Sequence, residues 1–396
     1  MKSLKVIAIL SFITVLLLSG CGKETEKVSD AQKSTPLVSQ PVPVQSEKKE
    51  ITPGDFIKAV EGIVKELENG KESGKVDWDK AAKIYNDGIK PLVQARDVEY
   101  KEQVNDQLEA SLKAGKDNSL SAGVVAELHE KLLQKVTFLN LRHDFKEAGD
   151  KFNDKKEAQA ELKEASEYYN GILKNMVSKR DNAYKTQLTT AIDGGFSEMT
   201  KAVDTGDNLA FNLGKQVVDK TVMKAFYLAS GAEKGYGYKL EKLVQEGTKE
   251  DIKAEQAEGW AFFQSLKGYL ARNNQEDAIY IEKQFDLSND PKNIKGDLIN
   301  QAYVRAFAAT AKGEYKESFE NWGKDKAVIT AMEGALFIDI LQGDLAKALG
   351  GEDKAKALIE NTRILIDVVK ENNKDKATEI YKNIESEIDK LAKYGK

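Results

Sequence analysis

Two histidines and their neighbouring glutamates are the side chains in this sequence best suited to holding a transition metal. His129 and His143 fall in one segment of helical periodicity, fourteen residues apart, so they can share a helix face but cannot meet at one ion. His143 and Glu147 are four residues apart and could both bind the same ion. The candidate metal ligands are therefore His129, Glu130, His143 and Glu147. A solvated or capping histidine is the favoured alternative, because no His-Glu-x-x-His motif is present.

A second run of oxygen-bearing side chains has part of the spacing of a calcium-binding loop. Asp286, Ser288 and Asp290 alternate along the chain, and Asp297 falls where such a loop places its last ligand. However, a proline stands where the loop needs glycine, and aspartate replaces the usual bidentate glutamate. The alternative interpretation is a turn and an N-cap ahead of a helix over 291–312.

Composition excludes several classes of site and partner. The 396 residues include 60 basic and 65 acidic side chains, a formal charge of -5, and one cysteine. One cysteine cannot build a disulfide framework or a cysteine-based zinc or iron–sulfur site. The acidic balance argues against a nucleic-acid partner. Both histidines lie in one segment and no Ser/His/Asp arrangement is convincing, so we expect no catalytic residue, no enzyme activity and no cofactor.

The N-terminal segment has the pattern of an export signal. Lys2 and Lys5 precede an apolar run over 6–18 that is too short to span a bilayer comfortably and is followed by small residues. This pattern predicts a cleaved signal peptide over 1–20. An uncleaved anchor helix is the alternative, and both readings place the protein outside the cytoplasm.

The residues that close this segment add a more specific indication. Leu18, Ser19 and Gly20 precede Cys21, and here the sequence resembles a bacterial lipoprotein precursor with its lipobox. The resemblance implies that Cys21 is lipidated on sulfur and becomes the mature N-terminus. Two or three acyl chains anchor a protein stably where one would not. We therefore expect a lipid-anchored protein on the extracytoplasmic side of the cell membrane.

Residues 21–52 are predicted to be a disordered, partly extended tether. They are rich in Lys, Glu, Ser, Gln and Pro, and they offer no apolar face to bury.

Beyond residue 52 the spacing of the apolar residues changes. Apolar residues recur every three or four positions, most clearly over 124–145 and 209–229, and no segment alternates as a strand would. The fold class that this pattern predicts is all-α.

A repeat within the helical region indicates duplicated units. Eight positions recur at an offset of 84 residues. The matched positions are Tyr85-Asn86 and Tyr169-Asn170, Val93 and Val177, Arg96-Asp97 and Arg180-Asp181, Tyr100-Lys101 and Tyr184-Lys185, and Gln103 and Gln187. Each unit reads as three helices with an Arg-Asp junction after the first. The predicted units are 53–149, 156–247, a divergent 248–324, and C-terminal helices over 325–396, forming elongated or stacked bundles.

The Arg-Asp junction has a mechanical interpretation. Asp97 and Asp181 suit the N-cap of the following helix, and Arg96 and Arg180 suit the end of the preceding one. Capping is the favoured interpretation over catalysis.

Pro91, inside the first copy, is expected to kink or restart its helix. Adjacent glycines at 194 and 195 in a predicted helix indicate a bend or a close helix contact.

Two functions follow as hypotheses. The first is a non-enzymatic envelope lipoprotein whose stacked helices bind a protein, peptide or solute. The second is envelope metal capture, because the order Tyr85, Val93, Arg96-Asp97, Tyr100 resembles helical extracellular domains of bacterial iron permeases. That resemblance implies iron binding by glutamate, aspartate and histidine at the four candidate metal ligands. A third hypothesis, an envelope hydrolase, is supported by no motif in the sequence.

Overall fold

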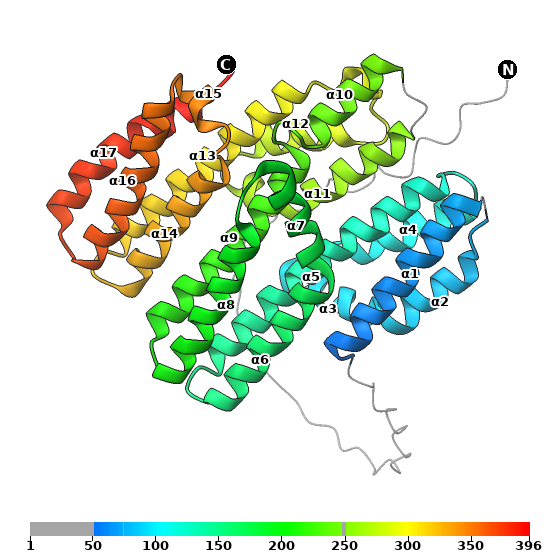
Figure 1. Cartoon of the computed structure of the whole chain (residues 1–396), viewed down its shortest axis with the longest axis horizontal. Coiled ribbons are helices and arrows are strands. Elements are labelled where there is room, and N and C mark those ends of the chain that lie inside the picture. Colours follow the sequence, from blue (N-terminus) through cyan, green and yellow to red (C-terminus); the bar gives the residue numbers. More distant parts are fainter. Residues whose placement is uncertain (1–50, 74, 248–250) are drawn as a thin grey trace, which may run out of the picture. The chain divides into compact units, whose positions relative to one another are not determined.

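The computed structural model describes residues 51–73, 75–247 and 251–396. The predicted signal peptide, Cys21 and nearly all of the predicted tether lie outside the described residues. Within them the regular secondary structure is entirely helical and contains no strand, which confirms the all-α prediction (Figure 1). None of the described helices has both the length and the apolar character needed to cross a membrane.

The helices follow one another with short connections. In the first half they are α1 Pro53–Ser73, α2 Trp78–Gly88, α3 Lys90–Tyr100, α4 Val104–Lys116, α5 Ala122–Asp150, α6 Lys155–Tyr168, the π-helical turn η1 Tyr169–Leu173, α7 Lys174–Tyr184, α8 Leu188–Thr205 and α9 Asn208–Ser230. In the second half they are α10 Tyr236–Glu246, α11 Ile252–Asn273, α12 Gln275–Phe285, the 3₁₀ turn η2 Pro291–Asn293, α13 Gly296–Glu320, α14 Asp325–Ile340, α15 Leu345–Leu349, α16 Glu352–Lys370 and α17 Lys374–Leu391.

Three long helices, α5, α9 and α11, form the centre of the core. The α5 helix packs against α1, α6 and α11, and α9 packs against α8, α11 and α14. Side chains are buried on most sides of α5 and α9, including charged ones such as Lys135 and Lys220. The periodic apolar residues over 124–145 and 209–229 belong to these two helices. Residues 52–396 form one compact unit, while the predicted divisions within it stay predictions.

The predicted repeat relates helices with matching ends. At an offset of 84 residues α3 coincides with α7 over its full length, and α4 and α8 begin at matching positions. Both α3 and α7 end in a lysine in the left-handed conformation, Lys101 at φ 57° and Lys185 at φ 58°. The connection between α3 and α4 therefore begins with the same backbone conformation as the connection between α7 and α8.

The aspartates of the repeat cap the next helix, but from a different position than predicted. Asp97 lies inside α3, and its carboxylate accepts hydrogen bonds from the amides of Val104 at 2.9 Å and Asn105 at 2.8 Å. Asp181 in α7 accepts in the same way from the first two amides of α8. The N-cap positions are held by Gln103 and Gln187, whose side chains form no capping hydrogen bond. The prediction of capping is confirmed, and the predicted N-cap position is wrong because the helices continue three residues past each Arg-Asp pair before the chain turns.

The proline of the first copy restarts its helix, as predicted. Pro91 lies in the first turn of α3, and α2 ends just before it at Gly88. At the matching place in the second copy, η1 joins α6 to α7 without a break. A prolyl residue cannot donate the backbone hydrogen bond that a continuous helix needs, whereas the second copy absorbs the irregularity as a π-turn.

The helix predicted over 291–312 begins later than expected. The chain forms η2, then runs extended through Ile294 and Lys295 before α13 starts at Gly296. Ile294 is buried, and the amide of Gly296 donates to Glu241 Oε2 at 2.9 Å. The extended step buries an apolar side chain that a continuous helix would place differently. The predicted start was therefore wrong by five residues.

The glycine pair in α8 marks a close helix crossing. A Cβ on Gly195 would lie 3.0 Å from the carbonyl oxygen of Gly214 and 2.6 Å from Val218 Cγ2. A Cβ on Gly214 would likewise lie 3.0 Å from the carbonyl oxygen of Gly195. Larger residues at either position would push α8 and α9 apart, which confirms the predicted close contact.

The C-terminal helices form a packed group around α13 and α14. The α13 helix contacts α14 and α17, α14 contacts α16, and α16 contacts α17, in yellow to red in Figure 1. The α17 helix buries Ala377, Ile384, Ile388 and Leu391. Its remaining surface includes a stripe that faces α13 and, with it, bounds the groove described next.

Candidate functional site

The candidate metal ligand His129 is part of the hydrophobic core. Its ring is fully buried, lies edge-on to the ring of Tyr85 with centroids 6.1 Å apart, and places Nε2 3.2 Å from the carbonyl oxygen of Leu108. Burial lowers the pKa of His129 to about 4, so the ring is neutral at physiological pH. Its environment is that of a packed core side chain.

The structure does not gather the other candidate metal ligands. Glu130 pairs with Lys131, and His143 Nδ1 lies 2.9 Å from Glu99 Oε2. Glu147 lies 3.6 Å from each of two lysines. Throughout the described ranges, no group of three or more histidine, cysteine, aspartate or glutamate side chains is arranged to hold a metal ion.

Two of the candidate calcium residues, Asp286 and Ser288, pair with each other, and Asp290 and Asp297 have separate partners. Asp286 accepts hydrogen bonds from the amide and hydroxyl of Ser288, and Asp290 accepts one from the amide at the start of η2. Asp297 accepts from the Tyr238 hydroxyl at 2.8 Å and from Lys347 at 2.9 Å. These contacts are those of a turn, a cap and a tertiary link, so the four side chains are not brought together.

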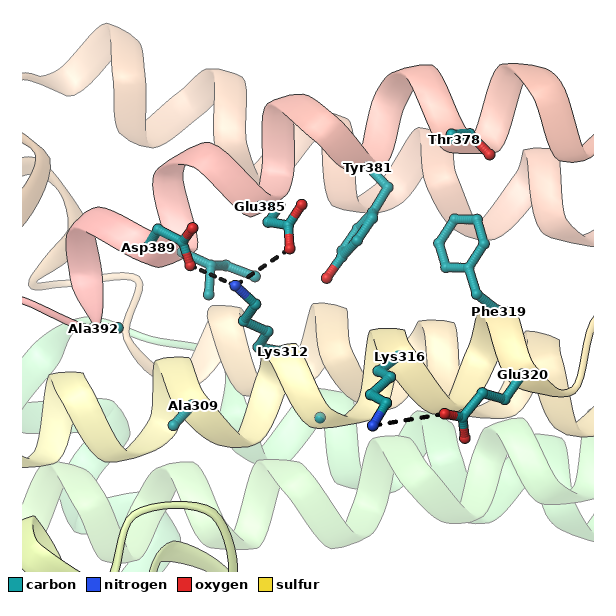
Figure 2. Close-up of a pocket in the computed structure, with 12 residues that line it drawn as sticks. Ala309, Lys312, Lys316, Phe319, Glu320, Thr378, Tyr381, Glu385, Asp389 and Ala392 are labelled. Atoms are coloured by element: carbon teal, nitrogen blue, oxygen red, sulfur yellow. Dashed lines mark hydrogen bonds and ion pairs between the residues drawn. The ribbon is translucent and has the colours of Figure 1, made fainter.

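A groove between α13 and α17 encloses about 760 Å³ (Figure 2). Each wall is a single helix face, because its lining residues follow the i, i+3, i+4, i+7 spacing that places side chains on one side of a helix. The α13 wall consists of Ala309, Lys312, Gly313, Lys316, Phe319 and Glu320, and the α17 wall consists of Thr378, Tyr381, Glu385, Ile388, Asp389 and Ala392.

The two ends of this groove differ in chemistry. At one end the half-buried rings of Phe319 and Tyr381 lie 5.1 Å apart between centroids, with the Tyr381 hydroxyl directed into the groove in Figure 2. At the other end Lys312 Nζ lies 2.6 Å from Asp389 and 3.2 Å from Glu385. Two carboxylates therefore share one ammonium, which leaves this end with a surplus negative charge.

The middle of the α13 wall is made of small residues. Ala309 is half-buried, and Gly313 carries no side chain. A Cβ on Gly313 would lie 3.0 Å from Asn273 Oδ1, so α11 approaches this helix closely from behind. Small residues keep the groove open between its aromatic and charged ends.

A second feature that the sequence did not predict is a buried ion cluster between α5 and α9. Asp219 is bound by Arg142, with Nε to Oδ1 at 2.6 Å and Nη2 to Oδ2 at 3.2 Å, and by Lys220 at 2.8 Å. Lys220 also lies 3.2 Å from Glu333 of α14. Burial alone would raise the pKa of Asp219, but the two cations outweigh it and hold the pKa well below its usual range.

Neither the groove nor the cluster carried a sequence motif. The groove-lining residues of α13 and α17 recur at helical spacing, which is the pattern of any helix face. The partners Arg142 and Asp219 are 77 residues apart, and only the packing of α5 against α9 brings them together. The one local signal was the presence of charged residues inside otherwise apolar helical segments.

No protein-family model matches this chain, and no match was found among curated proteins or among solved structures.

Proposed function

We propose that this protein is a lipid-anchored extracytoplasmic lipoprotein that acts without catalysis, binding an amphipathic helix of a partner protein in the groove between α13 and α17. The observation that carries the proposal is the pair of single-face helix walls on either side of one open groove (Figure 2). Helix-in-groove recognition uses such a surface, with ligand side chains anchored at helical spacing.

The length of the groove suits a short helical segment. From Ala309 to Glu320 the α13 wall spans eleven helical steps, or about 16 Å at roughly 1.5 Å per residue. A ligand helix of about three turns would cover that distance. Its apolar stripe would lie along Ala309 and Gly313, whose small size leaves room for it.

The two ends of the groove define the chemistry of the partner. Phe319 and Tyr381 offer aromatic surface to a large apolar side chain. The carboxylates of Glu385 and Asp389 share Lys312 and favour a lysine or arginine on the ligand. The partner segment is therefore an amphipathic helix with an apolar stripe and a basic residue near one end.

The location in this proposal depends on the N-terminal sequence. Leu18, Ser19, Gly20 and Cys21 support lipidation, and the Pro-containing residues 21–52 support a spacer between the lipid and the folded unit. A binding unit held on a spacer can reach partners near the membrane surface without lying on it.

The proposal is tested with synthetic peptides and the full chain in detergent micelles. A fluorescently labelled amphipathic peptide of about fourteen residues, with leucines at i, i+3, i+4 and i+7 and a lysine at one end, is titrated by anisotropy. We expect micromolar binding that Ala309→Phe abolishes by filling the groove. Ser386→Phe, on an exposed face of α17, is the matched control and should bind normally.

Three outcomes contradict this proposal. The first is that the peptide does not bind the unchanged protein. The second is that both phenylalanine variants weaken peptide binding equally. The third is a dimer of the full chain that Ala309→Phe dissociates, because then a second copy fills the groove. Circular dichroism of both variants shows whether their helical fold is intact.

A further inference from the structure

A cavity beside the buried ion cluster carries an inference that does not depend on the groove. It encloses about 480 Å³ between α5 and α9, with contributions from α3, α11 and α14, a size typical of small-molecule sites. Its walls combine aromatic, amide and charged side chains. The ones used below are Tyr100, Phe145, Asn212, Lys215, Gln216 and Tyr269.

The charges that line this cavity leave one ammonium in excess. Each of its three carboxylates is paired with a cation: Asp219 with Arg142 at 2.6 Å, Glu333 with Lys220 at 3.2 Å, and Asp150 with Lys146 at 2.6 Å. The fourth cation is Lys215. Among the described residues, no carboxylate lies within 4.0 Å of its Nζ.

The position of Lys215 is unfavourable for an empty cavity. Burial lowers the pKa of its ammonium, and the carboxylates of Asp219 and Glu333 oppose that shift without overcoming it. A desolvated ammonium gains most from a counter-ion brought directly to it. A bound anion would supply that counter-ion.

The surrounding side chains restrict which anion fits. One edge of the Arg142 guanidinium, Nε and Nη2, is bound to both carboxylate oxygens of Asp219, which neutralises the charge of Arg142, so Arg142 adds no net positive charge for a phosphate. One surplus positive charge balances one negative charge. The amide nitrogen of Asn212 already donates to Asn208, but among the described residues Gln216 uses only its amide oxygen, which accepts from Lys220 Nζ at 3.0 Å. The amide nitrogen of Gln216, which follows Lys215 on α9, can therefore donate to a carboxylate.

Aromatic walls indicate that the rest of the ligand is apolar. The Tyr269 ring contacts two cations, with its centroid 4.6 Å from the guanidinium carbon of Arg142 and 5.2 Å from Lys220 Nζ. Tyr100 and Phe145 form further wall surface from α3 and α5. We infer that this cavity binds an organic monocarboxylate with an aromatic or apolar body, its carboxylate held by Lys215.

Benzoate is a suitable probe for the test, with the full chain in detergent micelles and calorimetry as the assay. We expect benzoate to bind, and Lys215→Met to weaken its binding by at least about tenfold, the loss of one charge-assisted hydrogen bond. Lys201→Met removes an exposed lysine of α8 outside the cavity and should leave binding unchanged. Benzyl alcohol, which lacks the charge, should bind at least about tenfold more weakly than benzoate.

A thermal melt without ligand distinguishes loss of the site from loss of the fold. Because methionine replaces a half-buried ammonium that contacts no carboxylate of the described residues, Lys215→Met should melt at the same temperature as the unchanged protein or higher. The inference is overturned if benzoate does not bind, or if Lys215→Met binds it equally well. It is also overturned if benzyl alcohol matches benzoate, or if inorganic phosphate binds more tightly than benzoate.

Discussion

Replacing Asp219 with asparagine tests the buried ion cluster that joins α5 to α9. The substitution keeps the size of the side chain but removes the charge that both Arg142 and Lys220 contact, at distances of 2.6 to 3.2 Å. The Asp219 side chain is 7% exposed, so water cannot replace the lost interaction. Of the carboxylates in the described part of the chain, Lys220 would then contact only Glu333, and Arg142 would contact none.

The expected loss of stability is large for a single substitution. Breaking a buried ion pair by removing one partner costs about 3–5 kcal/mol, and asparagine retains one hydrogen-bond acceptor, so we expect about 3 kcal/mol. Urea unfolding followed by circular dichroism at pH 7 measures this change. Asp150→Asn is the matched control, because Asp150 pairs with Lys146 on the surface and its loss should leave the unfolding free energy unchanged within error.

The pH dependence provides a second check on the same residue. Because the pKa of Asp219 is depressed in the folded state, its contribution is present above the unfolded pKa, about 3.9, and is lost as the pH falls further. The difference between the unchanged protein and Asp219→Asn should therefore be constant from about pH 5 to 8 and shrink below about pH 4. A difference of less than about 1 kcal/mol at pH 7, or one independent of pH, would refute the reasoning.

Two further predictions concern a buried carboxyl group and the lipid anchor. Burial, with Glu164 and Glu161 nearby, raises the pKa of Asp144 to about 8, so its ionisation destabilises the folded state as the pH rises from about 4 to 8. Asp144→Asn should therefore raise the unfolding free energy more at pH 9 than at pH 5, by an amount on the order of a few kcal/mol in urea unfolding, and an equal effect at both pH values would contradict this. Cys21→Ser should release the protein from the membrane fraction and remove the lipid mass from its N-terminus, and an unchanged membrane fraction would argue against lipidation.

Helix positions followed from the sequence because apolar residues recur every three or four positions along the chain. The apolar residues over 124–145 belong to α5, and the repeated Arg-Asp pairs mark helix-capping carboxylates in α3 and α7. Helix ends were harder to predict. Asp97 caps α4 from inside α3, and α13 starts at Gly296 because Ile294 is buried first, and both outcomes depend on tertiary packing.

The groove between α13 and α17 was not predictable from the sequence, because it too depends on tertiary packing. Phe319 and Tyr381 meet only because α13 and α17 pack together, and each alone is an ordinary residue on a helix face. The predicted metal ligands failed to converge because His129 faces the core while His143 faces Glu99. Local spacing could place these side chains on a helix, but it could not say which neighbouring helix each would meet.

Photo-crosslinking in the intact cell tests the central claim most directly. A photoreactive phenylalanine analogue is placed at Tyr381 in the groove or at Ser386 on the exposed face of the same helix. Binding in the groove predicts an adduct at position 381 with an amphipathic helical segment of one partner protein, which peptide mapping identifies, and no such adduct at position 386. No adduct at position 381, or the same adducts from both positions, would contradict the proposal that this groove binds a partner helix.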